Sequence, residues 1–290
     1  MHLHALIQVP ILNRYNKPIT NTSCFGSRGS QVRILPPRLI IRKPLLLRLF
    51  CFVDYIMDKE RFYYDKKFLS SKSGRPIRLL SEYLFPLESF RRNQIKSTVV
   101  FFGSARIKDN DDIKINKYYN KAKELAFKIT KWNMKNFSGK RYVITSGAGP
   151  GIMEAANKGA KEAKGITVGL GISLPFEQTN NKWVTKGLNF VFHYFFMRKF
   201  WFIYLTKGIV IWPGGLGTLD EFFEILTLLQ TKKISRKIPI VLFGKDFWDG
   251  LIDWNKLISN NVISKTDLDL FVILDSVDET FDYLIKHMDN

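Results

Sequence analysis

Seven short apolar runs alternate with amphipathic segments over residues 98–287, and this alternation limits the possible folds more than any other feature. The runs are rich in Val, Ile and Phe and are continuous, as expected of strands buried on both faces of a parallel sheet. The predicted strands are Thr98–Phe102, Tyr142–Thr145, Thr167–Leu170, Asn189–Phe192, Gly208–Trp212, Ile240–Phe243 and Phe271–Leu274. The predicted helices are 116–132, 151–163, 193–206, 218–231, 247–259 and 278–287. The pattern predicts an α/β fold, a doubly wound (Rossmann-like) parallel sheet with right-handed crossovers.

Glycine-bearing turns follow three of the predicted strands, at Gly103–Arg106, Ser146–Gly151 and Pro213–Thr218. Ligands of doubly wound sheets bind at the carboxyl ends of the strands, so the three turns predict one shared site. None of them is a G-x-G-x-x-G fingerprint, and no acid follows the first turn at the distance expected for a ribose ligand. The sequence therefore argues against NAD.

The third turn suits a phosphate. It joins an apolar strand to an amphipathic helix, and its glycines let a ligand approach the backbone. The start of a helix offers unpaired N–H groups and the positive end of the dipole. We expect the backbone N–H groups of Gly214, Gly215, Gly217 and Thr218 to hold a phosphate group.

Two acids, Asp220 and Glu221, follow this turn at once. Thr218 and Glu221 fit a capping box, with Thr218 as N-cap and Glu221 at N3, and the dipole favours acids in a first turn. On spacing alone, capping is the favoured interpretation. The alternative is that Glu221 performs chemistry in the site.

The string Pro213–Glu221 reads Pro-Gly-Gly-x-Gly-Thr-x-x-Glu and resembles the signature of the LOG ("Lonely Guy") family of nucleoside 5′-monophosphate phosphoribohydrolases. The string Ser146–Asn157 resembles that of the longer bacterial members. Ala148 stands where those members usually have glycine; if the backbone there needs a positive φ, the Cβ costs on the order of 1 kcal/mol. Two matching strings in this order are more specific than either alone.

Between the two strings lies Arg198-Lys199, in a segment that is aromatic around its whole circumference and so predicts a mostly buried helix. Two adjacent cations there are costly unless they meet an anion or water. They can reach water by extending along one helix edge. The family has an Arg-Lys pair at this place, which implies that Arg198 is the catalytic arginine and that Lys199 lies beside it. The usual Met-His-x before the pair is replaced by Phe195-Phe196-Met197.

The resemblance implies hydrolysis of the N-glycosidic bond of purine nucleoside 5′-monophosphates to free base and ribose 5-phosphate. AMP is the expected general substrate, and cytokinin riboside 5′-monophosphates are further candidates because the family includes cytokinin-activating enzymes. An oxocarbenium-like ribosyl centre needs a carboxylate to stabilise it and to orient water, a role we assign to Glu221. The family also implies a homodimer, for which the aromatic helix around 195–204 could supply an interface. No metal or other cofactor is expected.

Further substrate contacts are expected from residues around these motifs. An acid in the loop after the third strand contacts the nucleotide in the family, which implies Glu177. Thr227 and Asp220 lie on the polar side of the helix that carries Glu221, and Gly147 and Gly149 lie in the second turn. The alternative function is a non-catalytic nucleotide or cofactor carrier on the same fold. Such a carrier has no need of the acid, so the presence of both Arg198 and Glu221 favours an enzyme.

Residues 1–56 differ from the rest of the chain. They contain both cysteines, one acid and eight basic residues, Arg14, Lys17, Arg28, Arg33, Arg38, Arg42, Lys43 and Arg48. Gly29–Arg38 resembles a translation of the 3′ part of a tRNA gene, because Val-Arg-Ile can be encoded by GTT CGA ATC of the T-loop. We therefore expect a non-native or disordered leader and a start at Met57. The alternatives are a genuine basic extension or a targeting peptide, although Pro44–Val53 is too short to span a bilayer. We expect an extension at 57–95 that packs on a single domain at 96–290.

The formal charge of +19 is that of a nucleic-acid binder at first sight, but +7 of it lies in residues 1–56. The remaining lysines are dispersed, so neither a nucleic-acid nor a membrane partner is expected. Residues 57–290 have no cysteine, which agrees with a cytoplasmic location. His193 and His287 lack metal-ligand spacing, and no G-x-S-x-G or Walker A motif occurs. Relatives of the LOG family have been labelled possible lysine decarboxylases, but nothing here marks a pyridoxal-phosphate lysine.

Overall fold

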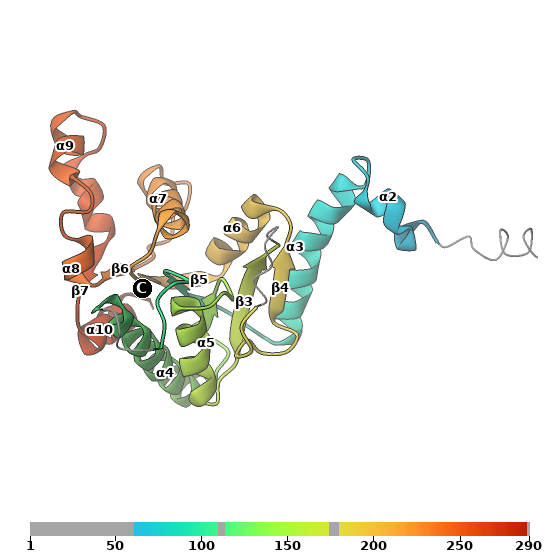
Figure 1. The fold of residues 1–290 in the computed structure, drawn as a ribbon, viewed down its shortest axis with the longest axis horizontal. Coiled ribbons are helices and arrows are strands. Elements are labelled where there is room, and N and C mark those ends of the chain that lie inside the picture. The colour runs from blue at the N-terminus through green and yellow to red at the C-terminus, as the bar shows by residue number, and fades with distance from the viewer. Residues whose placement is uncertain (1–60, 110–113, 174–179, 289–290) are drawn as a thin grey trace, which may run out of the picture. The chain divides into compact units, whose positions relative to one another are not determined.

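The computed structural model describes residues 61–109, 114–173 and 180–288 (Figure 1). Its centre is a sheet of seven strands in the order β4-β3-β2-β1-β5-β6-β7, with every adjacent pair parallel. The strands are β1 (Thr98–Phe102), β2 (Val143–Ser146), β3 (Thr167–Ile172), β4 (Asn189–Phe192), β5 (Thr206–Ile211), β6 (Ile240–Phe243) and β7 (Val272–Leu274). The predicted α/β, Rossmann-like parallel sheet is confirmed. The predicted leader at 1–56 lies outside the described residues.

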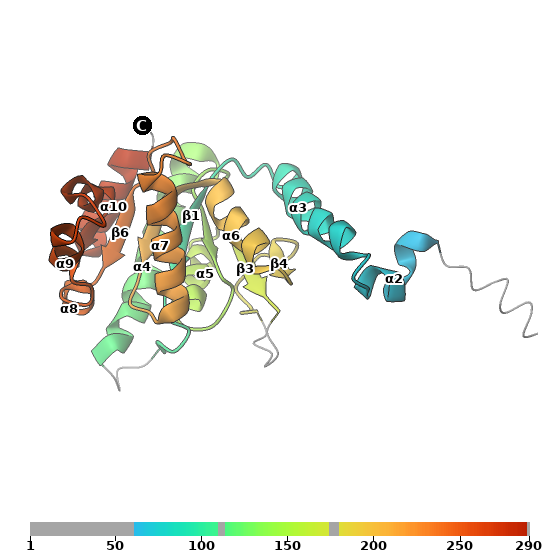
Figure 2. The same ribbon diagram turned by 90° about the horizontal axis from the view of Figure 1, so that it is seen from above.

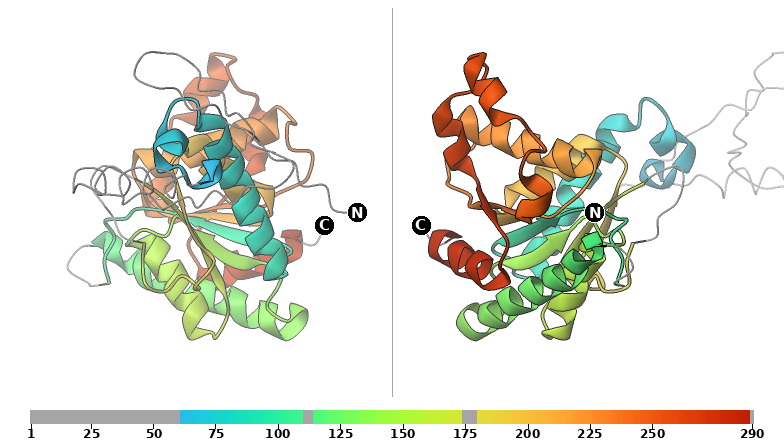
Figure 3. Two further views of the ribbon diagram at one scale, coloured as in Figure 1. Left: turned by 90° about the vertical axis from the view of Figure 1, so that its right-hand side faces the viewer. Right: turned by 60° about the vertical axis from the view of Figure 1, so that its left-hand side comes forward.

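Helices cover both faces of the sheet (Figure 2). One face is covered by α4 (Lys117–Phe137), α5 (Ile152–Glu162) and α10 (Val277–Met288), and Figure 3 shows α4 and α5 side by side along it. The other face is covered by α3 (Arg75–Arg92), α6 (Phe195–Tyr204) and α7 (Leu216–Gln230). The remaining helices are the short α2 (Lys66–Ser70), α8 (Lys245–Trp248) and α9 (Trp254–Ser259), with 3-10 turns at Phe62–Tyr64, Lys114–Asn116 and Lys265–Leu270. No helix in the described ranges is both long enough and apolar enough to span a bilayer.

The strand predictions hold, with small differences in the bounds of β2, β3, β5 and β7. All seven predicted strands exist, and β1, β4 and β6 have the predicted bounds. β4 is not buried throughout: its residues alternate between exposed and buried, because it is an edge strand with a partner on one side. The helix predicted at 247–259 is two short helices, because Gly250 has a φ of 76° and Asp253 then caps α9 through the N–H of Lys256.

Helix α3 was not predicted; residues 57–95 were expected to form only a polar extension. Pro86 lies inside α3 and cannot donate to the carbonyl of Glu82, one turn earlier. Trp201 of α6 donates its indole N–H to that carbonyl at 2.9 Å. The Glu82 carboxylate in turn accepts from the N–H groups of His193 and Tyr194, at 2.7 and 3.3 Å. The hydrogen bond lost at Pro86 is thus replaced by a contact that ties α3 to α6.

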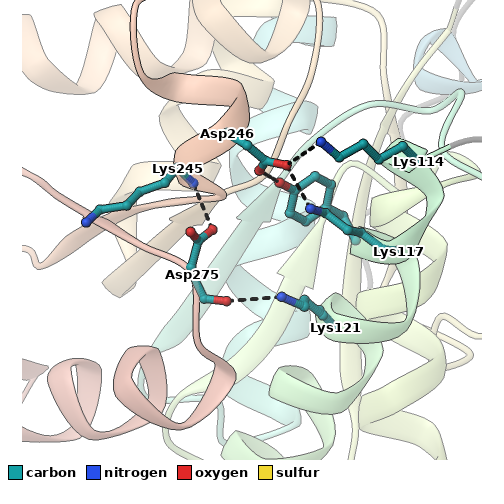
Figure 4. Close-up of polar contacts among 7 residues, drawn as sticks. Lys114, Lys117, Lys121, Lys245, Asp246 and Asp275 are labelled. Atoms are coloured by element: carbon teal, nitrogen blue, oxygen red, sulfur yellow. Dashed lines mark hydrogen bonds and ion pairs between the residues drawn. The ribbon is translucent and has the colours of Figure 1, made fainter.

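A polar cluster joins α8 and the loop after β7 to α4 (Figure 4). Asp246 accepts hydrogen bonds from Lys117, at 2.8 Å, and from the Tyr118 hydroxyl, and these bonds hold the pKa of Asp246 well below its usual range. Lys121 donates to the backbone carbonyl of Asp275 at 3.2 Å. Because every carboxylate of this cluster that we describe has a donor, we interpret it as a structural clamp.

Candidate active site

A cavity of about 700 Å³ lies at the carboxyl ends of β1, β2 and β5. β1 and β5 are neighbours from which the strand order runs in opposite directions, so the cavity lies at the topological switch point of the sheet. Its volume is typical of sites for small molecules. The lining residues are Phe102, Gly103, Ser104, Ala105, Arg106, Gly147, Met153, Arg198, Gly215, Leu216, Gly217, Thr218 and Glu221. The three glycine turns therefore meet at one cavity, as predicted.

Helix α7 begins two residues earlier than predicted, and the capping-box interpretation is wrong. Its N-cap is Gly215, which makes no side-chain capping bond, and the amides of Thr218 and Leu219 bond to the Gly215 carbonyl at 3.0 and 3.1 Å. Thr218 therefore lies within the first turn, and Glu221 lies beyond the reach of the helix end. Gly215, Leu216, Gly217 and Thr218 line the cavity, and the amides of Leu216 and Gly217, at the first two helical positions, have no acceptor within the helix.

Glu221 is buried at the cavity wall, with 5% of its surface exposed. Burial raises the pKa of its carboxyl to about 7, although the neighbouring Arg198 and Lys199 lower it. A carboxyl group with a pKa near neutrality can accept and return a proton at physiological pH. Because nothing in a capping role requires burial, this environment distinguishes Glu221 from a structural acid.

Arg198 lies on α6 and reaches the same cavity. Its Nε donates to the Leu170 carbonyl at the end of β3, at 2.7 Å, and its Nη1 lies 3.5 Å from Oε1 of Glu221. Its guanidinium lies over the ring of Phe202, 4.8 Å from the centroid. Burial lowers the pKa of Arg198, and Glu221 opposes this effect. The alternative in which Arg198 extends to water is therefore wrong, because it is buried against an anion.

Gly147 allows Arg198 to take this position. A Cβ at Gly147 would lie 2.6 Å from Nη2 of Arg198 and 2.7 Å from Sδ of Met153. Replacing Gly147 with alanine should therefore displace the guanidinium and lower kcat/KM by about tenfold or more, since small misplacements of catalytic groups are costly. Thermal unfolding measured alongside should show little change, because both clashing atoms belong to flexible side chains. Unchanged activity of this variant would contradict the close approach of the Arg198 guanidinium to Gly147.

The second glycine turn is held from behind by buried Asn157. Its Oδ1 accepts from the Ser146 hydroxyl at 2.7 Å, and its Nδ2 donates to Oγ1 of Thr167 at 2.6 Å. Ala148 has a φ of 61° and is fully buried, so the strain expected for a Cβ at this position applies. Asn157 supports the turn and does not line the cavity.

Several predicted site residues lie away from the cavity lining. Lys199 binds Asp220 and Glu224 on the outer side of α7, at 2.8 and 3.0 Å. Thr227 lies one and a half turns beyond Glu221, donates to the Phe223 carbonyl, and faces a separate small hollow formed with α9. The structure thus places Lys199, Asp220 and Thr227 outside the cavity lining, although Lys199 is near enough to Glu221 to lower the pKa of its carboxyl.

The predicted glycines divide in the same way. Gly147, Gly215 and Gly217 line the cavity, as Thr218 does. Gly214 lies behind the turn, where a Cβ would meet the Thr218 side chain at 2.1 Å. The Gly149 carbonyl accepts a hydrogen bond from Asn181 at 3.0 Å, outside the lining. Glu177 lies outside the described residues.

The turn at Gly103–Arg106 was predicted to lie at the site, but no role was predicted for its side chains. Arg106 lines the same cavity as the start of α7, is exposed, and forms no ion pair within the part of the chain that we describe. Ser104 accepts a hydrogen bond from the Arg106 amide at 3.0 Å and so shapes the turn. An arginine in the motif Gly-Ser-Ala-Arg, directly after a buried strand, was the available signal.

No lysine occurs among the lining residues, and no group of three or more His, Cys, Asp or Glu in the described ranges is arranged to hold a metal ion. The polar groups that a ligand would meet are the α7 amides, Arg106, Ser104 and the pair of Arg198 and Glu221. Fold and site together define an α/β protein with a small-molecule cavity at its switch point, equipped to bind an anion beside a buried carboxyl.

Comparisons with known proteins add the following. A family model described as "Possible lysine decarboxylase" matches residues 153–284, less than half of the chain but including Arg198 and all of α7. This description is the label attached to relatives of the LOG family. No curated protein matches the sequence.

Solved structures with similar folds share little sequence with this chain. The structural-genomics target TM1055 is 22% identical, with 66% of this chain and 98% of that chain covered and a TM-score of 0.41. The molybdenum cofactor carrier protein from Chlamydomonas reinhardtii is 18% identical, with 67% and 99% covered and a TM-score of 0.42. DNA processing protein A from Streptococcus pneumoniae is 20% identical, with 63% and 62% covered and a TM-score of 0.35.

Proposed function

We propose that this protein hydrolyses the N-glycosidic bond of purine nucleoside 5′-monophosphates and releases free base and ribose 5-phosphate. One observation carries the proposal: a single cavity contains both the glycine-rich start of α7 and the buried pair of Arg198 and Glu221. The first suits a 5′-phosphate, and the second suits a developing positive charge next to water. Either feature alone would have a structural explanation.

In the proposed mechanism, the amides at the start of α7 bind the phosphate and place the ribose over Glu221. The bond between C1′ and the base nitrogen breaks, and the electron pair leaves with the base. The Glu221 carboxylate stabilises the oxocarbenium-like centre and takes a proton from the attacking water, whose hydroxyl oxygen bonds to C1′. That proton passes to the departing base, so one water is consumed. Arg198 positions the nucleotide and limits the rise in the pKa of Glu221.

The test is chromatographic. Purified protein incubated with AMP should release adenine and ribose 5-phosphate in equal amounts, and GMP, CMP and an N6-prenylated AMP define the base preference. Binding of these nucleotides without any release would overturn the hydrolase and favour the non-catalytic carrier. A decarboxylase that uses pyridoxal phosphate would need a lysine in the site, and the lining residues include none.

The homodimer is part of the proposal. Phe195 and Phe196 on α6 are 52% and 53% exposed, an unusual state for adjacent aromatic side chains beside a site. We expect the protein to sediment as a dimer, and a Phe195→Ser, Phe196→Ser variant to sediment as a monomer. A wild-type monomer at micromolar concentration would contradict this part alone.

The pH dependence follows from Glu221. Its pKa is raised to about 7 and the mechanism uses the carboxylate, so kcat/KM for AMP should rise with pH through about 7 and level off above it. The phosphate of AMP also titrates, near 6. Binding of AMP to a Glu221→Gln variant over the same pH range isolates that contribution. A kcat/KM that falls as the pH rises through 7 would mean that the protonated acid is the working form.

Arg106 should bind the phosphate of the substrate. Because it lines the same cavity as the start of α7 and has no described ion-pair partner, it is free to meet a dianion. An Arg106→Gln variant should raise KM for AMP by about tenfold, the cost of one charge-assisted hydrogen bond, and leave kcat nearly unchanged. Hydrolysis of adenosine, which has no phosphate, should be unaffected. An equal loss with both substrates would place Arg106 elsewhere in the mechanism.

A further inference from the structure

A second hollow, of about 570 Å³, lies at the amino ends of β1 and β2, on the edge of the sheet opposite the candidate active site. It forms where the segments that follow α3 and α4 come together. The Lys96 amide donates to the Lys140 carbonyl at 2.8 Å and joins the two segments. The lining residues are Gln94, Ile95, Lys96, Phe137, Ser138, Lys140 and Arg141.

The charge of this hollow is entirely positive. Lys96, Lys140 and Arg141 line it, and no acid does. The chain has no Asp or Glu between Glu88 and Asp109, nor between Glu124 and Glu154, so the segments that build the hollow carry cations alone. Within the described ranges, none of the three lining cations forms an ion pair; five lysines elsewhere do, Lys114, Lys117, Lys128, Lys158 and Lys199.

The floor of the hollow is aromatic and well packed. The Phe137 ring contacts the rings of Trp132 and Tyr142, with centroids 5.1 and 5.4 Å apart. The Arg141 guanidinium lies over the same Phe137 ring, 5.1 Å from its centroid. A cation held flat on a ring loses less freedom when it binds an anion than a free side chain does.

Cations near the C-terminal end of a helix are favoured by its dipole, which is the simplest explanation of such residues. It covers Arg91, Arg92 and Lys135, which lie in the last turns of α3 and α4. The helix dipole does not explain Lys96, Lys140 and Arg141, which lie three or more residues beyond the helix ends and line one hollow. Gathering unpaired like charges there is unfavourable unless an anion joins them.

We propose that this hollow is a second binding site, for a phosphate-bearing anion. Lys96, Lys140 and Arg141 bind the phosphate oxygens, and the Ser138 hydroxyl and the Gln94 amide supply neutral hydrogen bonds. The volume is that of a nucleotide-sized ligand, and the Arg141–Phe137 stack presents a flat face to a base or sugar. The phosphate comes from a free compound or from a nucleic-acid strand. The site does not depend on the proposed hydrolase activity.

The experiment compares two variants of equal charge. Lys96→Gln, Lys140→Gln, Arg141→Gln removes the lining cations. Lys232→Gln, Lys233→Gln, Lys237→Gln removes three exposed lysines from the loop before β6 and serves as the control. Calorimetric titration with tripolyphosphate, ATP and a short single-stranded oligonucleotide, at about 0.15 M salt, measures the binding. The same titration of an Arg106→Gln variant shows whether the probe occupies the candidate active site. Circular dichroism and thermal unfolding establish that both variants fold.

The first variant should bind at least about tenfold more weakly than wild type, and the control within about twofold. Tightest binding of ATP or tripolyphosphate identifies a free compound as the source, and tightest binding of the oligonucleotide identifies a strand. Equal weakening in both variants would overturn the proposal, because binding would then follow net charge. Loss of binding in the Arg106→Gln variant, with binding retained in the first variant, would also overturn it, because the anion would then occupy the candidate active site.

Discussion

Replacing Glu221 with glutamine should lower kcat for AMP by about a thousandfold, the cost of removing a principal electrostatic group from a catalytic site. Glutamine keeps the size and the hydrogen-bonding oxygen of glutamate, but it cannot carry the negative charge that the proposed mechanism places beside C1′. Affinity for AMP should change little, because in the proposed mechanism the α7 amides, and not Glu221, hold the phosphate. Product release by chromatography and AMP binding by calorimetry measure the two effects separately.

The same variant separates a catalytic role from a structural one through its stability. Burial raises the pKa of Glu221 from 4.5 to about 7, so the folded state favours the protonated form. The stability that this group contributes is fully present below pH 4.5 and is lost as the pH rises through 7. Glutamine does not ionise, so at about pH 8 the variant should be more stable than wild type, by up to about 3 kcal/mol.

Glu224→Gln is the matched control. Glu224 lies three residues further along α7 and binds Lys199 at 3.0 Å, outside the cavity lining. This control should retain activity within a fewfold of wild type and show no gain in stability at high pH. Loss of stability in Glu221→Gln at every pH, with activity retained, would contradict the catalytic assignment.

Replacing Arg198 with lysine should lower kcat/KM by about a hundredfold, although the charge is kept. Lysine cannot reproduce the planar fork in which Nε binds the Leu170 carbonyl at 2.7 Å while Nη1 faces Glu221. Because Arg198 lowers the pKa of Glu221, weakening that contact should also raise the pKa seen in the activity profile. The measurement is kcat/KM for AMP across the pH range, in wild type and variant.

The adjacent lysine provides the control for this prediction. Lys199→Arg keeps a cation within reach of Asp220 and Glu224, so activity and its pH profile should remain close to wild type. If Lys199→Arg were the more damaging change, the substrate would lie on the outer side of α7, and the site described here would be wrong.

The doubly wound sheet could be predicted because its evidence is local. Each buried strand reads as a continuous apolar run, and each glycine turn follows one directly, so pattern and order suffice to place the three turns at one edge. The candidate pair was also visible, because Arg198 lies in an aromatic segment where a cation needs a partner.

The environment of Glu221 could not be predicted in the same way. Thr218 and Glu221 have the spacing of a capping box, and only the turn that the backbone makes at Gly215 decides whether the helix begins before or after Thr218. Starting at Leu216 moves Glu221 from the helix end to a buried wall beside Arg198. Lys199 and Thr227 lie outside the lining for another reason, since a helix turns by about 100° for each residue. Lys199 therefore leaves the face of α6 that carries Arg198, and Thr227, six residues further on, leaves the face of α7 that carries Glu221.

Helix α3 shows most clearly what could not be predicted from the sequence alone. A proline inside a helix leaves the carbonyl one turn earlier, here that of Glu82, without a donor, and no residue of the described part of this segment, 61–95, supplies one. The donor is the indole of Trp201, more than a hundred residues further along the chain. By itself the sequence determined the strand order in the chain, the glycine turns and the residue types of the site. The tertiary structure decided which acid is buried and which helix forms, because burial and long-range hydrogen bonds exist only between segments that folding brings together.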